Sequence, residues 1–80
     1  MPPLTDDDRR EIVRRFRRLE ETIDGNSPDV QTAYESFVQV YAGDCRAIIG
    51  AFPSATDRRS WLAQVHRCLL DEIDGAFWNP

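Results

Sequence analysis

Carboxylates crowd the last turns of two predicted helices, and their placement is the strongest indication of chemistry in the chain. One set precedes Gly25 and the other precedes Gly75. A helix C-terminus favours cations because its free carbonyl groups carry partial negative charge, so carboxylates there are locally unfavourable. Residues that break a local rule without an evident structural gain are candidates for function. The two sets comprise Glu20, Glu21, Asp24, Asp71, Glu72 and Asp74.

Phe77 and Trp78 are the second candidate site, because they follow the predicted helix stop at Gly75. Such an aromatic pair can fold back and complete a core, or it can anchor a protein interface, where aromatic side chains are enriched. We favour the core role for the pair. Trp78 is also retained as a candidate partner contact beside the carboxylates.

The residue types that build enzymes and metal sites are sparse. His66 is the only histidine, and no Cys/His cluster or glycine-rich phosphate loop accompanies it. The paired carboxylates are expected on solvated helix ends, where nothing raises a pKa toward neutrality. Cys45 and Cys68 are interpreted as buried free thiols, with a disulfide between the central and last helices as the alternative. We therefore expect no enzyme, no metal site and no cofactor.

The charge balance argues against nucleic acid as the main ligand. The formal net charge is −4, and all ten basic residues are arginine. Six arginines lie within residues 6–24, but several are spaced i,i+4 from carboxylates, which is typical of an ion-paired, solvated helix face. The predicted pairs are Asp6–Arg10, Glu11–Arg15 and Arg17–Glu21.

Three amphipathic helices are predicted, over residues 6–24, 28–52 and 55–75. Thr5 and Asp8 have the spacing of a capping box for the first helix, and Ser27 and Pro28 are typical of the start of the second. The central helix is expected because large apolar residues recur every three or four positions. These residues are Val30, Tyr34, Phe37, Tyr41, Cys45, Ile48 and Phe52.

Short connections between long amphipathic helices favour antiparallel neighbours, so the sequence predicts an all-α, single-domain, up–down–up three-helix bundle. A break near Gly43 is the alternative and would give four helices. We favour a continuous central helix because the apolar spacing continues past Gly43. In the three-helix arrangement the first and last helices end at the same pole, which would unite the six carboxylates.

The predicted function is that of a small acidic protein-binding module, an inhibitor or adaptor that occludes a basic surface of a larger protein. Phage-encoded inhibitors such as anti-CRISPR proteins share this size and charge, although no motif links the chain to them. The alternatives are a dimeric DNA-binding regulator that uses the arginine-rich helix, and a structural or assembly subunit. The chain is expected to be a monomer or a homodimer.

Residues 1–6 lack the basic start and apolar run of a secretory signal, and no apolar stretch approaches the roughly 20 residues of a membrane span. We therefore expect a cytoplasmic protein without membrane contact.

Overall fold

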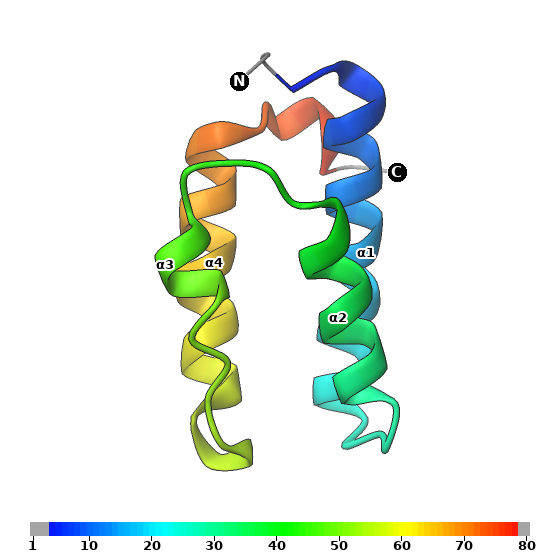
Figure 1. The fold of residues 1–80 in the computed structure, drawn as a ribbon, viewed down its shortest axis with the longest axis vertical. Helices are drawn as coiled ribbons and strands as arrows, with labels where there is room; N and C mark the ends of the chain where they lie inside the picture. The colour runs from blue at the N-terminus through cyan, green and yellow to red at the C-terminus, as the bar shows by residue number, and fades with distance from the viewer. Residues whose placement is uncertain (1–3, 79–80) are drawn as a thin grey trace.

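The computed structural model describes residues 4–78, and these residues confirm the predicted all-α class (Figure 1). The α-helices are α1 (Asp6–Asp24), α2 (Val30–Val40), α3 (Arg46–Ile49) and α4 (Arg58–Glu72). Two short 3-10 turns flank α4, namely η1 (Ala55–Asp57) and η2 (Gly75–Phe77). No strand occurs in the described part of the chain, and none of its helices is long and apolar enough to cross a membrane.

Helix α1 has the predicted bounds, and its first turn is closed by the predicted capping box. The Thr5 hydroxyl accepts a hydrogen bond from the Asp8 N–H, and the Asp8 carboxylate accepts one from the Thr5 N–H, both at 3.1 Å. At the other end Asn26, rather than Gly25, takes a left-handed backbone conformation with φ of 50°. This residue turns the chain toward α2, which packs along α1.

The predicted continuous helix over residues 28–52 is wrong, and the alternative with a break near Gly43 is the one observed. Helix α2 ends at Val40, and Tyr41 has an extended backbone. Residues 41–54, which we call the strap, cross to α4 and contain only the single turn of α3. The strap buries Ile49, which is 2% exposed, rather than Ile48 of the predicted stripe. The apolar spacing therefore continues past residue 43, although the helix ends at Val40.

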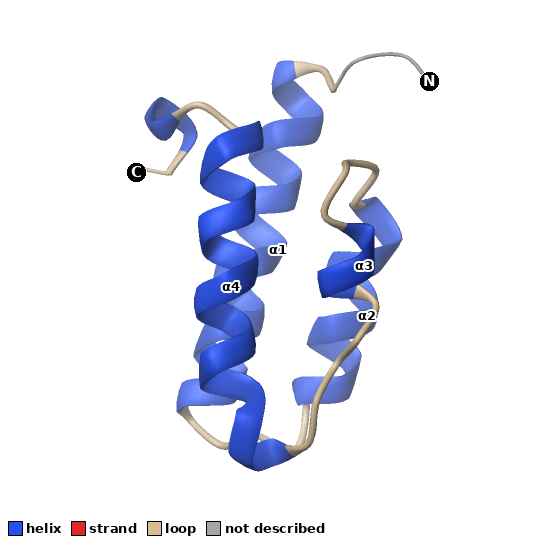
Figure 2. Cartoon of the chain, turned by 90° about the vertical axis from the view of Figure 1, so that its left-hand side faces the viewer, coloured by secondary structure: helices blue, strands red, loops and turns tan. Residues whose placement is uncertain are grey.

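The break also reverses the direction of the last helix. The strap runs back along α4, so α4 starts at the end of the molecule where α1 finishes (Figures 1 and 2). At that end Arg59 lies 3.5 Å from the Asp24 carboxylate. At the other end the Arg10 guanidinium lies 5.6 Å from the ring centre of Phe77. The expected parallel arrangement of the two outer helices is therefore wrong.

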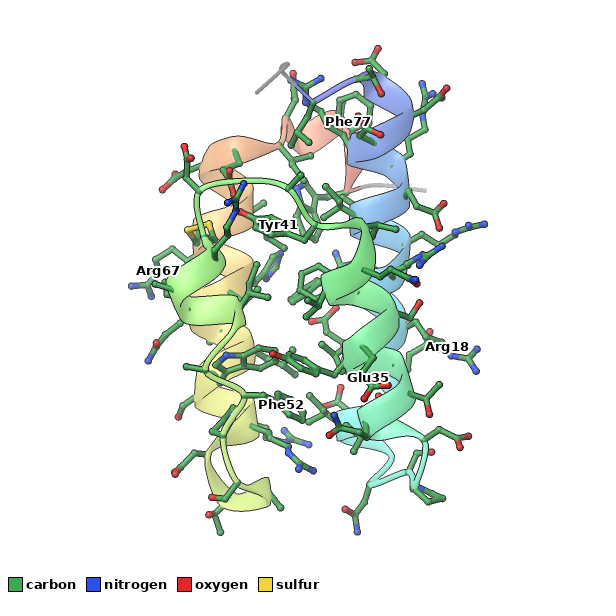
Figure 3. All side chains as sticks on the ribbon, viewed as in Figure 1. Arg18, Glu35, Tyr41, Phe52, Arg67 and Phe77 are labelled. Atoms are coloured by element: carbon green, nitrogen blue, oxygen red, sulfur yellow. A yellow bond between two sulfur atoms is a disulfide. The ribbon has the colours of Figure 1, made fainter. Side chains whose placement is uncertain are left out.

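Aromatic side chains fill the space between the α1–α2 pair and the strap–α4 half (Figure 3). Phe16 is fully buried, and its ring centre lies 5.7 Å from that of Phe37 and 5.8 Å from that of Trp78. The remaining fully buried large side chains belong to all four helices and to the segment after α4. They are Ile12, Leu19, Phe37, Ile49, Val65, Leu69 and Ile73.

A second aromatic group fastens the strap to both halves. Phe52 stacks on Tyr34 of α2 with ring centres 4.2 Å apart, and it meets Trp61 of α4 edge-on at 5.0 Å. The Tyr34 hydroxyl donates to the Ile49 carbonyl at 2.9 Å, and the Trp61 indole N–H donates to the Ile48 carbonyl at 2.8 Å. The strap thus contributes side chains to the core and is fastened to both halves.

Candidate functional site

The six carboxylates of the predicted site do not share one end of the molecule. Glu20, Glu21 and Asp24 lie at the end of α1, whereas the other three lie at the opposite extreme, around the end of α4 (Figure 1). The cause is the reversal of α4 by the strap. The common acidic pole inferred from parallel outer helices is therefore wrong.

Most of these carboxylates also have internal partners. Glu20 pairs with Arg17 at 2.7 Å, Asp24 pairs with Arg59, and Asp74 accepts the Ala76 N–H at 3.0 Å. Glu72 accepts hydrogen bonds from the strap. Within the described residues, only Glu21 and Asp71 of the six expose a carboxylate that has no hydrogen bond or ion pair.

Trp78 is a core residue and not an exposed anchor. It is 8% exposed, packs edge-on against Phe16, and lies 4.8 Å from the His66 ring centre. The Arg17 guanidinium covers its face at 5.1 Å. The indole N–H is buried and has no hydrogen-bond partner among the described residues. The favoured core role agrees with these contacts, and a partner could reach little of this side chain.

A different acidic end is present, formed by the start of α1, the first residues of the strap and the segment around the end of α4 (Figure 1). Arg9, Arg10 and Arg46 share it, and Arg67 lines a groove with Asp71, so the carboxylates of this end outnumber its arginines by seven to four. The rest of the molecule carries seven carboxylates and six arginines. The seven carboxylates of the acidic end are Asp6, Asp7, Asp8, Asp44, Asp71, Glu72 and Asp74.

Sequence reasoning identified three of these seven as a site and missed the rest. Asp6, Asp7 and Asp8 lie in the first turn of α1, where negative charge complements the helix dipole. Asp44 lies in the strap, directly after Gly43. These residues come to one end of the molecule because of the direction of α4. Local sequence patterns do not determine that direction.

Glu72 organises the strap side of the acidic end. The Tyr41 hydroxyl donates to one oxygen of the Glu72 carboxylate, and the Asp44 N–H donates to the other at 2.8 Å. The Tyr41 oxygen in turn accepts the Cys45 N–H at 2.7 Å. Burial, with a further contribution from the hydrogen bond to Glu72, raises the pKa of Tyr41. Gly43 is required here because a Cβ would collide with the Glu72 carboxylate and the Tyr41 side chain.

A disulfide joins Cys45 of the strap to Cys68 of α4, so the interpretation of both residues as free thiols is wrong. The strap places their Cα atoms 6.3 Å apart, within the range that a disulfide spans. One Glu72 oxygen lies 2.9 Å from the Cys45 sulfur. This contact is not a hydrogen bond, because a disulfide sulfur has no proton to donate. Disulfides are typical of oxidising compartments, and the cytoplasmic location stays a prediction.

The arginines of α1 are engaged in ion pairs. The predicted Glu11–Arg15 pair is confirmed at 2.6 Å, whereas Asp6, Asp7 and Glu20 pair three residues away rather than four, with Arg9, Arg10 and Arg17. Arg14 also binds Glu11, and Arg15 donates to the Ser36 carbonyl of α2 at 2.9 Å. Five of the six arginines in α1 thus contact a carboxylate, as expected for an ion-paired helix face.

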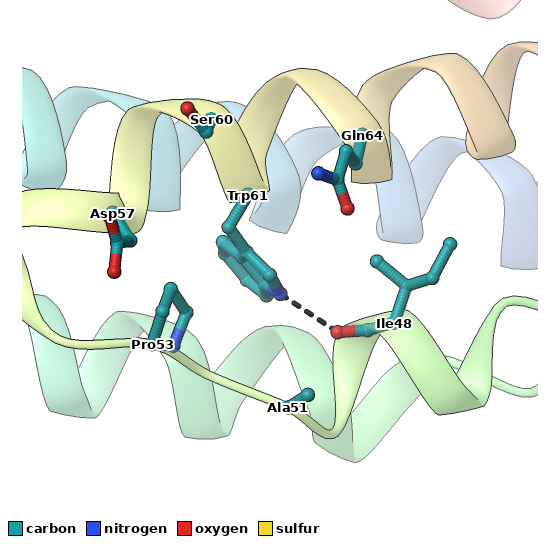
Figure 4. Close-up of a pocket in the computed structure, with 7 residues that line it drawn as sticks. All are labelled: Ile48, Ala51, Pro53, Asp57, Ser60, Trp61 and Gln64. Carbon is teal, nitrogen blue, oxygen red and sulfur yellow. Dashed lines mark hydrogen bonds between the residues drawn. The ribbon is translucent and has the colours of Figure 1, made fainter.

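A groove of about 340 Å³ runs between the strap and α4, with Trp61 as part of its wall (Figure 4). Its one ionisable side chain is Asp57, and neither a base nor a second carboxylate lines it. His66 lies elsewhere, with its ring tilted against that of Phe16 and the two ring centres 5.7 Å apart. The groove therefore brings together no acid–base pair.

Comparisons of the chain with protein-family models, with curated proteins and with solved structures find no match. The functional interpretation accordingly rests on the charges and contacts described above.

Proposed function

We propose that the protein is a non-enzymatic binding module that docks its acidic end on a basic surface of a larger protein. The observation that supports this proposal is the charge distribution, since seven carboxylates and four arginines lie at one end and the rest of the molecule is nearly balanced. Complementary charge orients two proteins during encounter and accelerates their association. A charged end on an otherwise nearly balanced molecule favours one orientation over the others.

The acidic end is also held in a fixed shape. The capping box fixes the first turn of α1, while Glu72 and the disulfide attach the strap to α4. Prior ordering reduces the conformational entropy that is lost on binding. The carboxylates that could meet a partner first are exposed, namely Asp7, whose side chain is 95% exposed, Asp44 and Asp71.

An inhibitor or adaptor would act by occupying the basic surface. A nucleic-acid-binding surface is one such target, because it presents lysine and arginine side chains to phosphates. Carboxylates held at one end of a small bundle can compete for those side chains. A phage inhibitor of the anti-CRISPR type is one protein that would work in this way.

The test begins with affinity capture from the native host and identification of the captured protein by mass spectrometry. The affinity of that protein is then measured for Asp44→Lys/Asp71→Lys and for a control, Glu21→Lys/Glu35→Lys. Both variants change the net charge equally, and Glu21 and Glu35 are exposed outside the acidic end. We expect the first variant to bind about tenfold more weakly, which corresponds to about 1.4 kcal/mol, and the control to bind within about twofold of the wild type.

Equal losses in both variants would mean that only net charge matters and that the acidic end is not a docking surface. The alternative of a DNA-binding regulator has its own test. Affinity for duplex DNA that falls steeply as salt is raised would support it, whereas no binding at low salt would exclude it.

A further inference from the structure

We propose that the reduced form of the protein binds a thiophilic divalent cation, such as Zn²⁺, through Cys45, Cys68 and Glu72. The strap supplies Cys45, while α4 supplies Cys68 and Glu72, which are four residues apart and therefore lie on the same helix face. One ligand atom from each residue lies within 4.8 Å of the other two. Ligand atoms around tetrahedral zinc lie about 3.3–3.8 Å apart, given Zn–S and Zn–O distances of about 2.3 and 2.0 Å.

The oxidation state decides whether the ligands exist. In the disulfide the two sulfur atoms are bonded to each other, and metal binding requires thiolates. Two molecules of a thiol reductant supply two electrons and two protons, which yields the Cys45 and Cys68 thiols and the disulfide of the reductant. Cation binding then releases both thiol protons to solvent. Metal binding and disulfide formation are thus mutually exclusive states of the same pair of residues.

The site needs only side-chain rearrangement on reduction. The Cα atoms of Cys45 and Cys68 are 6.3 Å apart, which allows the sulfur atoms to separate by rotation about their Cα–Cβ bonds. A Glu72 oxygen already lies 2.9 Å from the Cys45 sulfur. Hydrogen bonds from Tyr41 and from the Asp44 N–H hold both oxygens of that carboxylate. Such supporting hydrogen bonds orient metal ligands and are part of the design of protein metal sites.

A cation can approach from the side of Cys68. Cys45 is 2% exposed, but Cys68 is half-buried and lines a groove of about 300 Å³ with Gln64, Arg67 and Asp71. Solvent in this groove can complete the coordination, because three-ligand zinc sites commonly hold water in the fourth position. The proposal does not depend on partner docking, since Asp44 and Asp71 are not members of the ligand set.

The experiment titrates the full chain with Co²⁺ and Zn²⁺ after reduction with a phosphine and removal of the phosphine under anaerobic conditions. Co²⁺ reports thiolate coordination by its charge-transfer absorption, and Zn²⁺ affinity follows from competition with a chromophoric chelator. We expect one equivalent per chain, thiolate absorption that Zn²⁺ abolishes, and no such absorption for the oxidised protein. Glu72→Gln should weaken Zn²⁺ binding at least about tenfold, whereas Asp71→Asn should leave it unchanged.

The oxidised wild type is the control for thiolate coordination, because it keeps the strap in place without free thiols, and circular dichroism of the reduced protein checks that its helices are retained. Equal Zn²⁺ affinity in the oxidised and reduced forms would overturn the proposal, as would a reduced protein that binds neither cation. Unchanged affinity in Cys68→Ser would overturn it by excluding the thiolates. Unchanged affinity in Glu72→Gln would overturn the assignment of the third ligand.

Discussion

The α1–α2 pair and the strap–α4 half are stabilised by contacts of very different range. In α1 the ion pairs join residues three or four positions apart, and a short turn at residues 25–29 leads directly into α2. In the other half the disulfide joins residues 23 positions apart, and Tyr41 and Glu72 are separated by 31. Helix α1 itself is thus stabilised by local ion pairs, although its packing on α2 uses contacts 21 positions apart, whereas the strap depends on links that form only once the chain has folded back.

The comparison predicts where the molecule is vulnerable. Local contacts can be lost singly with small effects, because neighbouring turns and the apolar face keep the helix in place. A long-range link closes a loop, so its loss returns conformational entropy to the whole segment. Substitutions of equal chemical size should therefore be more damaging in the strap than in α1.

Removal of the disulfide should have the largest effect. Closing a loop of about 23 residues stabilises the folded state by about 3 kcal/mol, against a total of about 4–12 kcal/mol for a chain of this length. We expect Cys45→Ala/Cys68→Ala to lose about that much in urea denaturation. Hydrogen exchange should show that the strap amides lose protection first, while amides of α1 and α2 keep theirs.

A uniform loss of protection over all four helices would contradict this view of the strap. The single variant Cys68→Ala is the control, because it also removes the disulfide and should reproduce the double variant within error. A much larger loss in the single variant would assign the effect to the unpaired Cys45 thiol rather than to the link.

The same contrast explains what could be predicted from the sequence. The bounds of α1 and its capping box followed from residue spacing and end signals. The path of the strap could not be predicted, because the spacing of Cys45, Ile48 and Phe52 suits either a continuing helix or a segment folded onto the same core. Helix α2 ends at Val40, and Tyr41 then donates to Glu72, 31 positions away, a contact that residue spacing does not contain. The error in the central helix gave α4 the wrong predicted direction. As a result, the prediction united carboxylates that the structure places at opposite ends (Figure 1).

Tyr41→Phe should have an intermediate effect. The substitution removes the hydroxyl that donates to Glu72 and accepts the Cys45 N–H, so two polar groups lose a partner. We expect a loss of about 1–3 kcal/mol at neutral pH, measured by urea denaturation. Tyr34→Phe is the control, since it also removes a strap hydrogen bond but leaves only the Ile49 carbonyl without a partner. A smaller loss in Tyr41→Phe than in Tyr34→Phe would contradict the central role of Glu72.

The pH dependence gives Tyr41 a separate test. Its pKa in the folded state is raised above the ordinary value of 10, mainly by burial, so folding favours the protonated phenol. The resulting stability is fully present below about pH 10 and declines as the pH rises toward the folded-state pKa. The free energy of unfolding of Tyr41→Phe should therefore fall less steeply than that of the wild type as the pH rises above about 10. If the free energy of unfolding of the variant falls with pH as steeply as that of the wild type, groups other than Tyr41 cause the loss of stability at alkaline pH.

The smallest effect should come from the local pair of Glu11 and Arg14. The Arg14 hydrogen bond, followed by that of Arg15, lowers the pKa of Glu11 below its ordinary value of 4.5. A lowered carboxyl pKa contributes stability above the ordinary value, and that stability is lost as the pH falls through the folded-state pKa. Arg14→Gln should return the Glu11 pKa toward 4.5 in an NMR titration, with little change in unfolding at neutral pH because the pair is exposed to solvent.

Arg18→Gln is the matched control, because Arg18 is an exposed arginine on the same helix. An equal rise of the Glu11 pKa in both variants would mean that the overall charge of α1 sets the pKa, and not the direct hydrogen bond. If only Arg14→Gln acts, the interaction is confined to one turn of the helix. Such confinement is why losing the contact should leave the fold unaffected, in contrast to the strap.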